Sequence, residues 1–167
     1  MIQPVSAQIH ADLAHKNGFL GDGIGIAFLD TGLSPHRDFS PVSQRIEAFV
    51  DFVHHKYECY DDNSHGTHIT GIACSAGRTG KDYIGIAPKA HIISLKVLNS
   101  LGNGVPSAFI HGLQWIHENY RIYQIRIVNI SIGSPGTDED QTSREILRQV
   151  NQLWDDGLIV CIAGGNH

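Results

Sequence analysis

The sequence lacks any apolar run long enough to cross a membrane, and its beginning does not look like a secretory leader. Met1-Ile2-Gln3-Pro4 contains no basic residue, and no apolar core follows it. We therefore expect no membrane association and a cytoplasmic location. A secreted protein whose leader had been removed would show the same sequence, so that alternative stays open.

Basic clusters and an even set of cysteines are also missing. The 12 Lys and Arg residues are outnumbered by 17 Asp and Glu residues, for a formal net charge of -5. This gives no reason to expect nucleic acid or an anionic membrane as a partner. The three cysteines cannot all pair, and Cys74 and Cys161 lie in apolar runs where a reduced thiol packs as a small hydrophobic group. That usage is typical of a reducing compartment.

Hydrophobic residues and glycines, in contrast, are plentiful. With 41% hydrophobic residues and 18 glycines, residues 1–167 are expected to form one turn-rich domain with a single core. Apolar runs predict strands at residues 24–29, 45–52, 91–98, 126–132 and 158–163. Helical periodicity predicts helices over residues 6–16, from His65 onward, over 106–120 and from Thr142 to Gly157. This alternation predicts an α/β fold in three layers, with a mostly parallel twisted sheet and helices on both faces.

Several residues predict how the helices begin and which faces they bury. Ser64 is a suitable N-cap, which places His65 in a first turn where the helix dipole disfavours a charged imidazole. Gly66 and Gly71 would allow another backbone or a substrate to approach closely. The last helix has the pattern of a capping box and of a buried stripe; the residues are Thr142 and Glu145 for the box, and Ile146, Leu147, Val150, Leu153 and Trp154 for the stripe.

Three polar side chains fall where such a sheet gathers ligands, beyond the carboxyl ends of its strands. Asp30 ends the first predicted strand, Asn166 follows the last, and His65 opens a helix. A carboxylate, an imidazole and an amide donor can serve as orienter, general base and oxyanion donor of an acyl-transfer site. A nucleophile is not evident.

The same residues also allow other interpretations. Asp30 before Thr31-Gly32 can simply make a turn, or Asp-Thr-Gly can carry one carboxylate of an aspartic protease, which would need an all-β fold. His65 and His68 are one helical turn apart and could chelate a metal, but the Glu of a zinc protease is missing between them. The sequence also contains a second group of metal-ligand types, in what reads as a solvated loop: His54, His55, Cys59 and Asp61.

Four segments resemble sequence blocks of the subtilisin-like serine proteases, in that family's order, and the similarity runs from about Ser6 to the last residue. They are Asp30-Thr31-Gly32, His65-Gly66-Thr67-His68 with Gly71, Asn129-Ile130-Ser131-Ile132-Gly133 and Ala163-Gly164-Gly165-Asn166. The resemblance implies that Asp30 orients His65, that His65 is the base and that Asn166 is the oxyanion donor. The family's fifth block, which carries the nucleophilic serine, would lie beyond His167.

The resemblance also implies a groove in which an extended polypeptide substrate pairs as an added strand. One wall would be Leu101, Gly102 and Gly104, and the other would be Ser131, Ile132 and Gly133. Ala163 and Gly164 would form the floor of the primary specificity pocket, and Asn63 would line the adjacent subsite. Small residues there would leave room for a large apolar substrate side chain.

The family chemistry requires no cofactor, although many relatives bind a structural calcium ion. Gln3 and Asp38 fall near positions that supply calcium ligands, whereas the loop at residues 77–82 is cationic and does not resemble the calcium loop of the secreted enzymes. The sequence therefore does not decide whether a structural calcium ion binds. The sequence of residues 80–88 looks more like that of the intracellular branch of the family.

Two hypotheses about function follow. In the first, the chain is the N-terminal part of a serine endopeptidase, and a further segment or a second chain supplies the serine; alone it would not cleave peptides. In the second, it is a catalytically inactive relative that binds peptides or regulates a partner. In either case the last predicted strand would leave apolar surface for a further segment, a partner or another copy to cover.

Overall fold

The computed structural model describes residues 5–39, 44–78, 84–131 and 141–164. It contains five strands, β1 (Gly25–Asp30), β2 (Ile46–Asp51), β3 (His91–Lys96), β4 (Ile125–Ile130) and β5 (Ile159–Ile162). The helices are α1 (Val5–Gln8), α2 (Ala11–Lys16), α3 (His65–Cys74), α4 (Pro106–Asn119) and α5 (Gln141–Asp155). Each predicted strand is present, with bounds within two residues of those expected.

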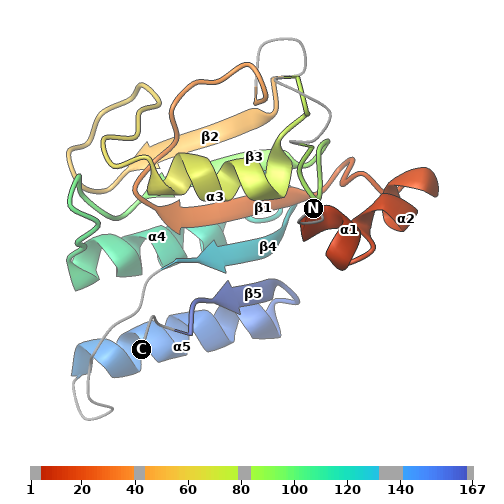
Figure 1. Cartoon of the computed structure of the whole chain (residues 1–167). Helices are drawn as coiled ribbons and strands as arrows, with labels where there is room; N and C mark the ends of the chain where they lie inside the picture. Colours follow the sequence, from red (N-terminus) through yellow and green to blue (C-terminus); the bar gives the residue numbers. More distant parts are fainter. Residues whose placement is uncertain (1–4, 40–43, 79–83, 132–140, 165–167) are drawn as a thin grey trace.

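The strands form one sheet in the order β2-β3-β1-β4-β5 (Figure 1). All four neighbouring pairs are parallel, as the alternation of strands and helices predicts. β1 therefore lies at the centre, between β3 and β4. Its last residue, Asp30, pairs with Lys96 at the end of β3, so both lie at the carboxyl edge of the sheet.

Alternate residues of β1 face two different layers of helices. Ile26 and Phe28 belong to a core cluster that includes Cys74 of α3, whereas Ala27 and Leu29 belong to a larger cluster. The helical members of the larger cluster come from α4 and α5, and they are Phe109, Leu113, Ile116 and Leu153. Figure 1 shows α3 on one side of the sheet and α4 on the other. The predicted three-layer α/β fold is thus confirmed.

The single helix predicted for residues 6–16 is wrong, because the chain forms two short helices there. His10, between α1 and α2, has a φ of 58° in the left-handed region, which interrupts the helix. The predicted end of the segment is confirmed, since Gly18 follows α2 with a φ of 84°. Figure 1 shows both helices beside the sheet rather than over its centre.

Helix α5 departs from the sequence predictions at its start and on its face. It begins at Gln141, so Thr142 lies inside the helix and the capping box is wrong; Glu145 instead bonds to Arg148 and Gln149. Leu153 is 1% exposed, but Leu147 and Trp154 are 52% and 63% exposed. The predicted buried stripe is therefore only partly buried.

The environments of the cysteines also separate. Cys74 is fully buried, as expected, and burial raises the pKa of its thiol to about 12. Cys161 is exposed on β5, so its predicted role as a packed hydrophobic group is wrong. No helix within the described ranges is both long and apolar enough to cross a membrane.

Candidate active site

Asp30 and His65 form a hydrogen-bonded pair at the carboxyl edge of the sheet. The Nδ1 atom of His65 lies 2.8 Å from Oδ1 of Asp30. Asp30 is 1% exposed, and its Oδ1 also accepts the backbone N–H of Thr31 at 2.7 Å. The His65 side chain, in contrast, is 45% exposed. A buried carboxylate thus holds one edge of an imidazole that remains open to solvent.

Close contact between two backbones makes this pair possible. A Cβ atom on Gly66 would lie 2.3 Å from the carbonyl oxygen of Gly32 and 3.1 Å from Oδ1 of Asp30. Only glycine at position 66 lets α3 approach the end of β1 so closely. At Gly71 the nearest atom to an added Cβ would be 4.0 Å away, on Phe39, so the close backbone approach predicted there is wrong.

The first turn of α3 is capped, but not by Ser64. Ser64 has a φ of 81° and makes no side-chain cap, which contradicts its predicted role. The N–H of Gly66 instead donates to Oγ1 of Thr31 at 2.9 Å, and the N–H of Thr67 donates to Oδ2 of Asp61 at 2.9 Å. Acceptors brought from the end of β1 and from the preceding loop therefore satisfy the helix start.

Asp61 organises the loop that leads into His65. Its carboxylate accepts the hydroxyls of Thr31 (2.8 Å) and Thr67 (2.6 Å) and the N–H groups of Asn63 and Ser64. Burial alone would raise the pKa of Asp61, but hydrogen bonds from Thr67, Thr31 and Ser64 outweigh it and lower that pKa to about 2. The carboxylate is therefore ionised at neutral pH and fixes the loop. Treating Asp61 as part of a solvated loop was wrong.

The residues predicted for one groove wall lie beside the His65 loop. Asn63 donates through Nδ2 to the carbonyl oxygen of Ser100 at 2.9 Å. Asn99 shapes the wall, because its Oδ1 accepts the N–H groups of Leu101 and Asn103. Leu101 is 78% exposed. Gly102 and Gly104 are likewise exposed on this loop.

The structure describes only some of the other predicted site residues. Ser131 is half-buried just beyond β4, and its hydroxyl accepts a hydrogen bond from Asn129 at 2.7 Å. Ala163 and Gly164 are exposed just beyond β5, where the N–H of Ala163 donates to the carbonyl oxygen of Ile130 at 3.0 Å. The predictions for Ile132, Gly133 and Asn166 fall outside the described residues. β4 and β5 thus deliver these described residues to the same edge as Asp30.

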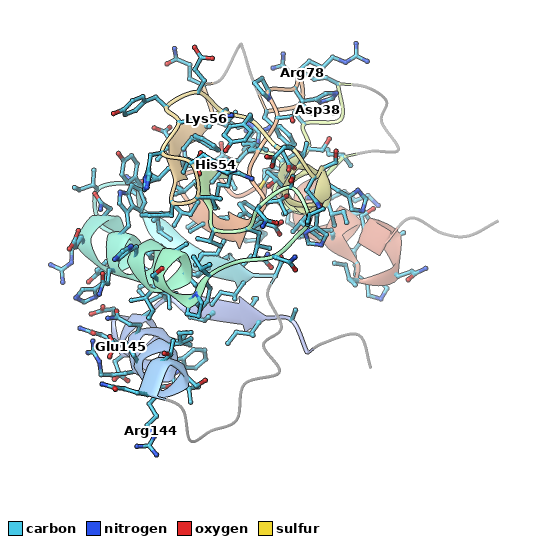
Figure 2. The ribbon with its side chains drawn as sticks, turned by 90° about the vertical axis from the view of Figure 1, so that its left-hand side faces the viewer. Asp38, His54, Lys56, Arg78, Arg144 and Glu145 are labelled. Carbon is cyan, nitrogen blue, oxygen red and sulfur yellow. The ribbon has the colours of Figure 1, made fainter. Side chains whose placement is uncertain are left out.

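Asp38, near which a calcium ligand was predicted, is hydrogen-bonded to Arg78 and Arg45. Oδ1 of Asp38 accepts the backbone N–H of Arg78 at 2.7 Å, and Figure 2 shows the two residues side by side. The guanidinium of buried Arg45 donates to three backbone carbonyl oxygen atoms, those of Asp38, Cys74 (2.8 Å) and Ala90 (3.3 Å). Gln3 lies outside the described residues.

Other metal-ligand groupings gain no support from the geometry. The described ranges contain no group of three or more His, Cys, Asp or Glu residues that could hold a metal ion. His65 instead binds Asp30, and His68 lies exposed on α3. The parallel sheet also rules out the all-β architecture on which an aspartic protease depends.

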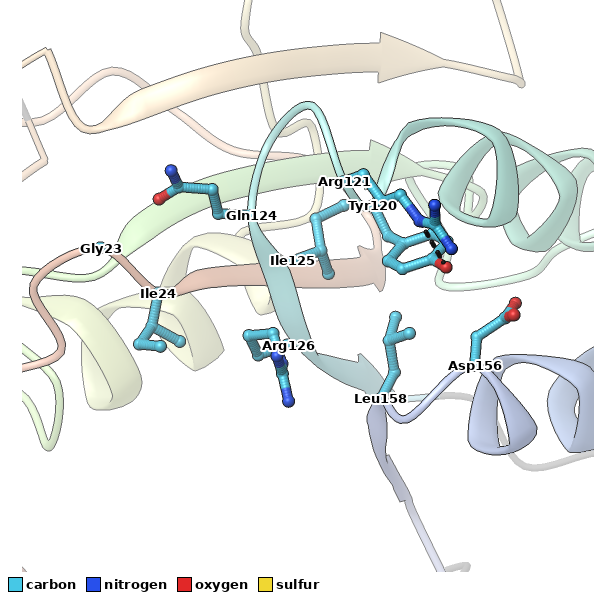
Figure 3. A pocket seen from close by; sticks show the side chains of 9 residues that line it. All are labelled: Gly23, Ile24, Tyr120, Arg121, Gln124, Ile125, Arg126, Asp156 and Leu158. Atoms are coloured by element: carbon cyan, nitrogen blue, oxygen red, sulfur yellow. Dashed lines mark hydrogen bonds between the residues drawn. The ribbon is translucent and has the colours of Figure 1, made fainter.

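A pocket of about 460 Å³ lies at the opposite edge of the sheet. Figure 3 shows Ile24, Ile125 and Leu158 lining it, and these residues adjoin the amino ends of β1, β4 and β5. Asp30, at the carboxyl end of β1, is therefore remote from it. Figure 3 also shows the guanidinium of Arg121, which donates to the hydroxyl of Tyr120 at 2.9 Å. This pocket is separate from the Asp30 and His65 pair.

Comparison with known proteins agrees with this geometry. The sequence model described as the subtilase family matches residues 21–167. The chain belongs to the subtilase family. This subtilase is 37% identical over 164 residues to "Serine protease AprX" of Bacillus subtilis (strain 168), and the match covers 94% of the chain but 36% of AprX. It is 34% identical over 161 residues to "Subtilisin Savinase" of Lederbergia lenta, covering 96% of the chain and 54% of that relative.

Solved structures show the same fold. A cold adapted subtilisin-like serine proteinase superposes on this subtilase with a TM-score of 0.71 at 27% identity, over 89% of the chain and 48% of the proteinase. The Clostridium perfringens CspB protease superposes with a TM-score of 0.74 at 22% identity, over 93% of the chain and 39% of the protease. The subtilase described here thus spans about half or less of these relatives' length.

Thr31 and Lys96 have structural roles in the site that no pattern in the sequence predicted. Thr31 was noted only as part of Asp-Thr-Gly, yet its hydroxyl links Gly66 to Asp61. Lys96 is 0% exposed, although it lies in a strand predicted from an apolar run. A lysine inside such a strand was the available signal, because a buried ammonium requires partners.

Proposed function

We propose that this subtilase is the part of a serine endopeptidase that supplies the base, its orienting carboxylate and one groove wall. The hydrogen bond between Nδ1 of His65 and buried Asp30 supports this proposal most directly. An ionised carboxylate can only accept, so Nδ1 carries the hydrogen in the neutral imidazole and Nε2 is left able to take a proton. The exposed side chain of His65 lets a nucleophile reach it.

In the proposed reaction the serine lies on residues outside these 167, on the same polypeptide or on a second chain. Its hydroxyl oxygen attacks the scissile carbonyl carbon while Nε2 of His65 takes the hydroxyl proton. Asp30 stabilises the imidazolium, and Asn166 donates to the oxyanion, a contact worth about 3 kcal/mol in the transition state. His65 then protonates the leaving amine, and water releases the acyl group by the same route. No metal or cofactor takes part in these steps.

The proposed substrate is an extended polypeptide. Residues 99–104 and 131–133 would flank it, with Ala163 and Gly164 at the primary specificity pocket and Asn63 at the next subsite. The exposed side chain of Leu101 offers apolar contact there. Backbone groups of the two walls would pair with the substrate backbone.

The surface around β5 supports the proposed contact with a further segment, a second chain or another copy. Ile159 and Ile162 of β5 are 56% and 57% exposed, and Trp154 of the neighbouring α5 is 63% exposed. Apolar side chains in such number at a sheet edge favour coverage. We propose a cytoplasmic location and no requirement for calcium in the chemistry.

The proposal is tested by labelling the purified native protein with a fluorophosphonate probe and measuring its intact mass under denaturing conditions. We expect the probe on a serine outside these 167 residues, and peptide cleavage that His65→Ala reduces about 10⁵- to 10⁶-fold. His68→Ala, one turn further along α3, is the matched control and should cleave normally. Absence of both labelling and cleavage in the native protein would favour the alternative, an inactive subtilase that binds peptides.

A further inference from the structure

Lys96, the last residue of β3, has a completely buried side chain. Its ammonium donates to the carbonyl oxygen of Thr31 at 2.5 Å, to Oδ1 of Asp62 at 2.7 Å and to the carbonyl oxygen of Leu98 at 2.8 Å. An ammonium has three N–H bonds, so these three acceptors use all of them. The ring of Tyr60 also lies 5.0 Å from the ammonium nitrogen.

The three acceptors belong to three different parts of the site. Thr31 directly follows Asp30 at the end of β1. Asp62 lies three residues before His65, and Leu98 leads into the groove wall at residues 99–104. The ammonium of Lys96 therefore joins the end of β1 beside Asp30, the loop that leads into His65 and the start of the groove wall at residues 99–104.

Sheet pairing cannot replace this connection. It fixes β1 against β3, but residues 52–64 between β2 and α3 contain no helix or strand, only the isolated bridge of Asp61 with Gly32. Burial of an ammonium is costly unless its hydrogen bonds are kept, so any movement of the three segments apart leaves a charge unpaired. An apolar side chain in this place would pack without fixing their separation.

We propose that Lys96 is a positioning residue that sets the distance between the Asp30 and His65 pair and the groove wall at residues 99–104. The link from Asn63 Nδ2 to the Ser100 carbonyl oxygen makes a second connection between the same loop and the same wall. As a role in peptide cleavage the inference rests on the proposed function. As a statement about geometry it can be tested without activity.

The test compares Lys96→Met with Lys89→Met in the full protein, by amide hydrogen exchange. Lys89 is an exposed lysine paired with Asp22, so its substitution removes a charge without touching the site. In Lys96→Met we expect about tenfold faster exchange at Gly66 and Asn99, whose N–H groups report the start of α3 and the wall. Amides of β1 and β3 should keep their protection.

Faster exchange at all amides in Lys96→Met would overturn the proposal, because it would show that Lys96 only stabilises the fold as a whole. Exchange equal to that of Lys89→Met would overturn it too, because it would show that Lys96 does not hold these segments. If Lys96→Met does not fold, Asp62→Ala supplies the same comparison at a position where the carboxylate is 34% exposed. It should loosen Gly66 and Asn99 several-fold, and no change there would also overturn the proposal.

Activity gives a separate readout. If the native protein cleaves peptides, Lys96→Met should lower kcat and raise KM, since both the base and the wall lose their position, whereas Lys89→Met should change neither. A native protein without activity whose Gly66 and Asn99 amides still respond to Lys96→Met would contradict the proposed function while supporting the geometric inference.

Discussion

Gly66 lies so close to Gly32 that a Cβ atom on Gly66 would stand 2.3 Å from the Gly32 carbonyl oxygen. The clashing atom belongs to the backbone, which cannot rotate away as a flexible side chain could. Gly32 itself has a φ of 124° and is equally confined, because its own Cβ would meet the Tyr60 carbonyl oxygen at 2.2 Å. The contact between α3 and the end of β1 thus depends on two glycines.

Gly66→Ala should therefore push α3 away from β1 and break the bond between His65 and Asp30. We expect a loss of a few kcal/mol in the free energy of unfolding, measured with urea, together with loss of any peptide cleavage. Gly71→Ala is the matched control in the same helix. Its Cβ meets only ordinary contact at 4.0 Å, so helix propensity should make it neutral or stabilising by up to about 1 kcal/mol. Equal effects of the two substitutions would contradict this account.

Asp61 should make stability depend on pH in the acid range. Its pKa in the folded protein is about 2, below the ordinary value of 3.8, so its contribution is complete above about pH 4 and is lost as the pH falls toward 2. Asp61→Asn should lower the unfolding free energy at pH 7 and flatten its fall between pH 4 and 2. Urea unfolding at a series of pH values measures this. An unchanged acid slope in Asp61→Asn would show that other carboxylates carry it.

Thr70, in the middle of α3, buries a hydroxyl that finds no hydrogen-bond partner among the described residues. Thr70→Val keeps the shape and removes the unsatisfied group, so we expect the unfolding free energy to rise by about 1 kcal/mol and Tm to rise by about 3 °C. Calorimetry measures both. Thr67→Val is the contrasting variant, since that hydroxyl donates to Asp61 at 2.6 Å and accepts the N–H of Ser34 at 2.9 Å; it should be destabilising.

Neighbouring apolar residues at the end of α5 should respond differently to truncation. Leu153→Ala removes a side chain that is 1% exposed and should cost about 2 to 5 kcal/mol in unfolding free energy. Trp154→Ala removes a larger side chain that is 63% exposed and should cost less than about 1 kcal/mol. Chemical denaturation of the two variants gives the comparison. A large cost at Trp154 would mean that a partner covers this surface in solution.

Patterns within single segments predicted the fold well. Periodic apolar residues located the strands and most helices, because the residues that an element buries recur at a regular spacing along the chain. In β1 the buried residues follow one another directly, and they are Ile26, Ala27, Phe28 and Leu29. Asp30 was predicted at the site because it ends a strand of a parallel sheet, and His65 because it opens a helix. The resemblance to a family added their roles.

Side-chain links between distant segments could not be predicted in the same way. Ser64 had the residue type of a cap, but tertiary contacts with Asp61 and Thr31 took over that function. Lys96 joins residues 34 to 65 positions away along the chain, and no local pattern specifies such partners. On α5, periodicity marks apolar positions but cannot say whether Trp154 has anything to pack against.

Every described hydrogen bond that holds the Asp30 and His65 pair, through Thr31, Asp61 and Lys96, joins residues between 30 and 98. During synthesis the groups that assemble the pair have therefore left the ribosome before the exposed wall at residues 99–104, and well before Asn166. A protease that cuts the chain within residues 99–104 would interrupt that wall without breaking any of these hydrogen bonds. Such a nicked protein would keep the proposed general base but break the proposed substrate wall.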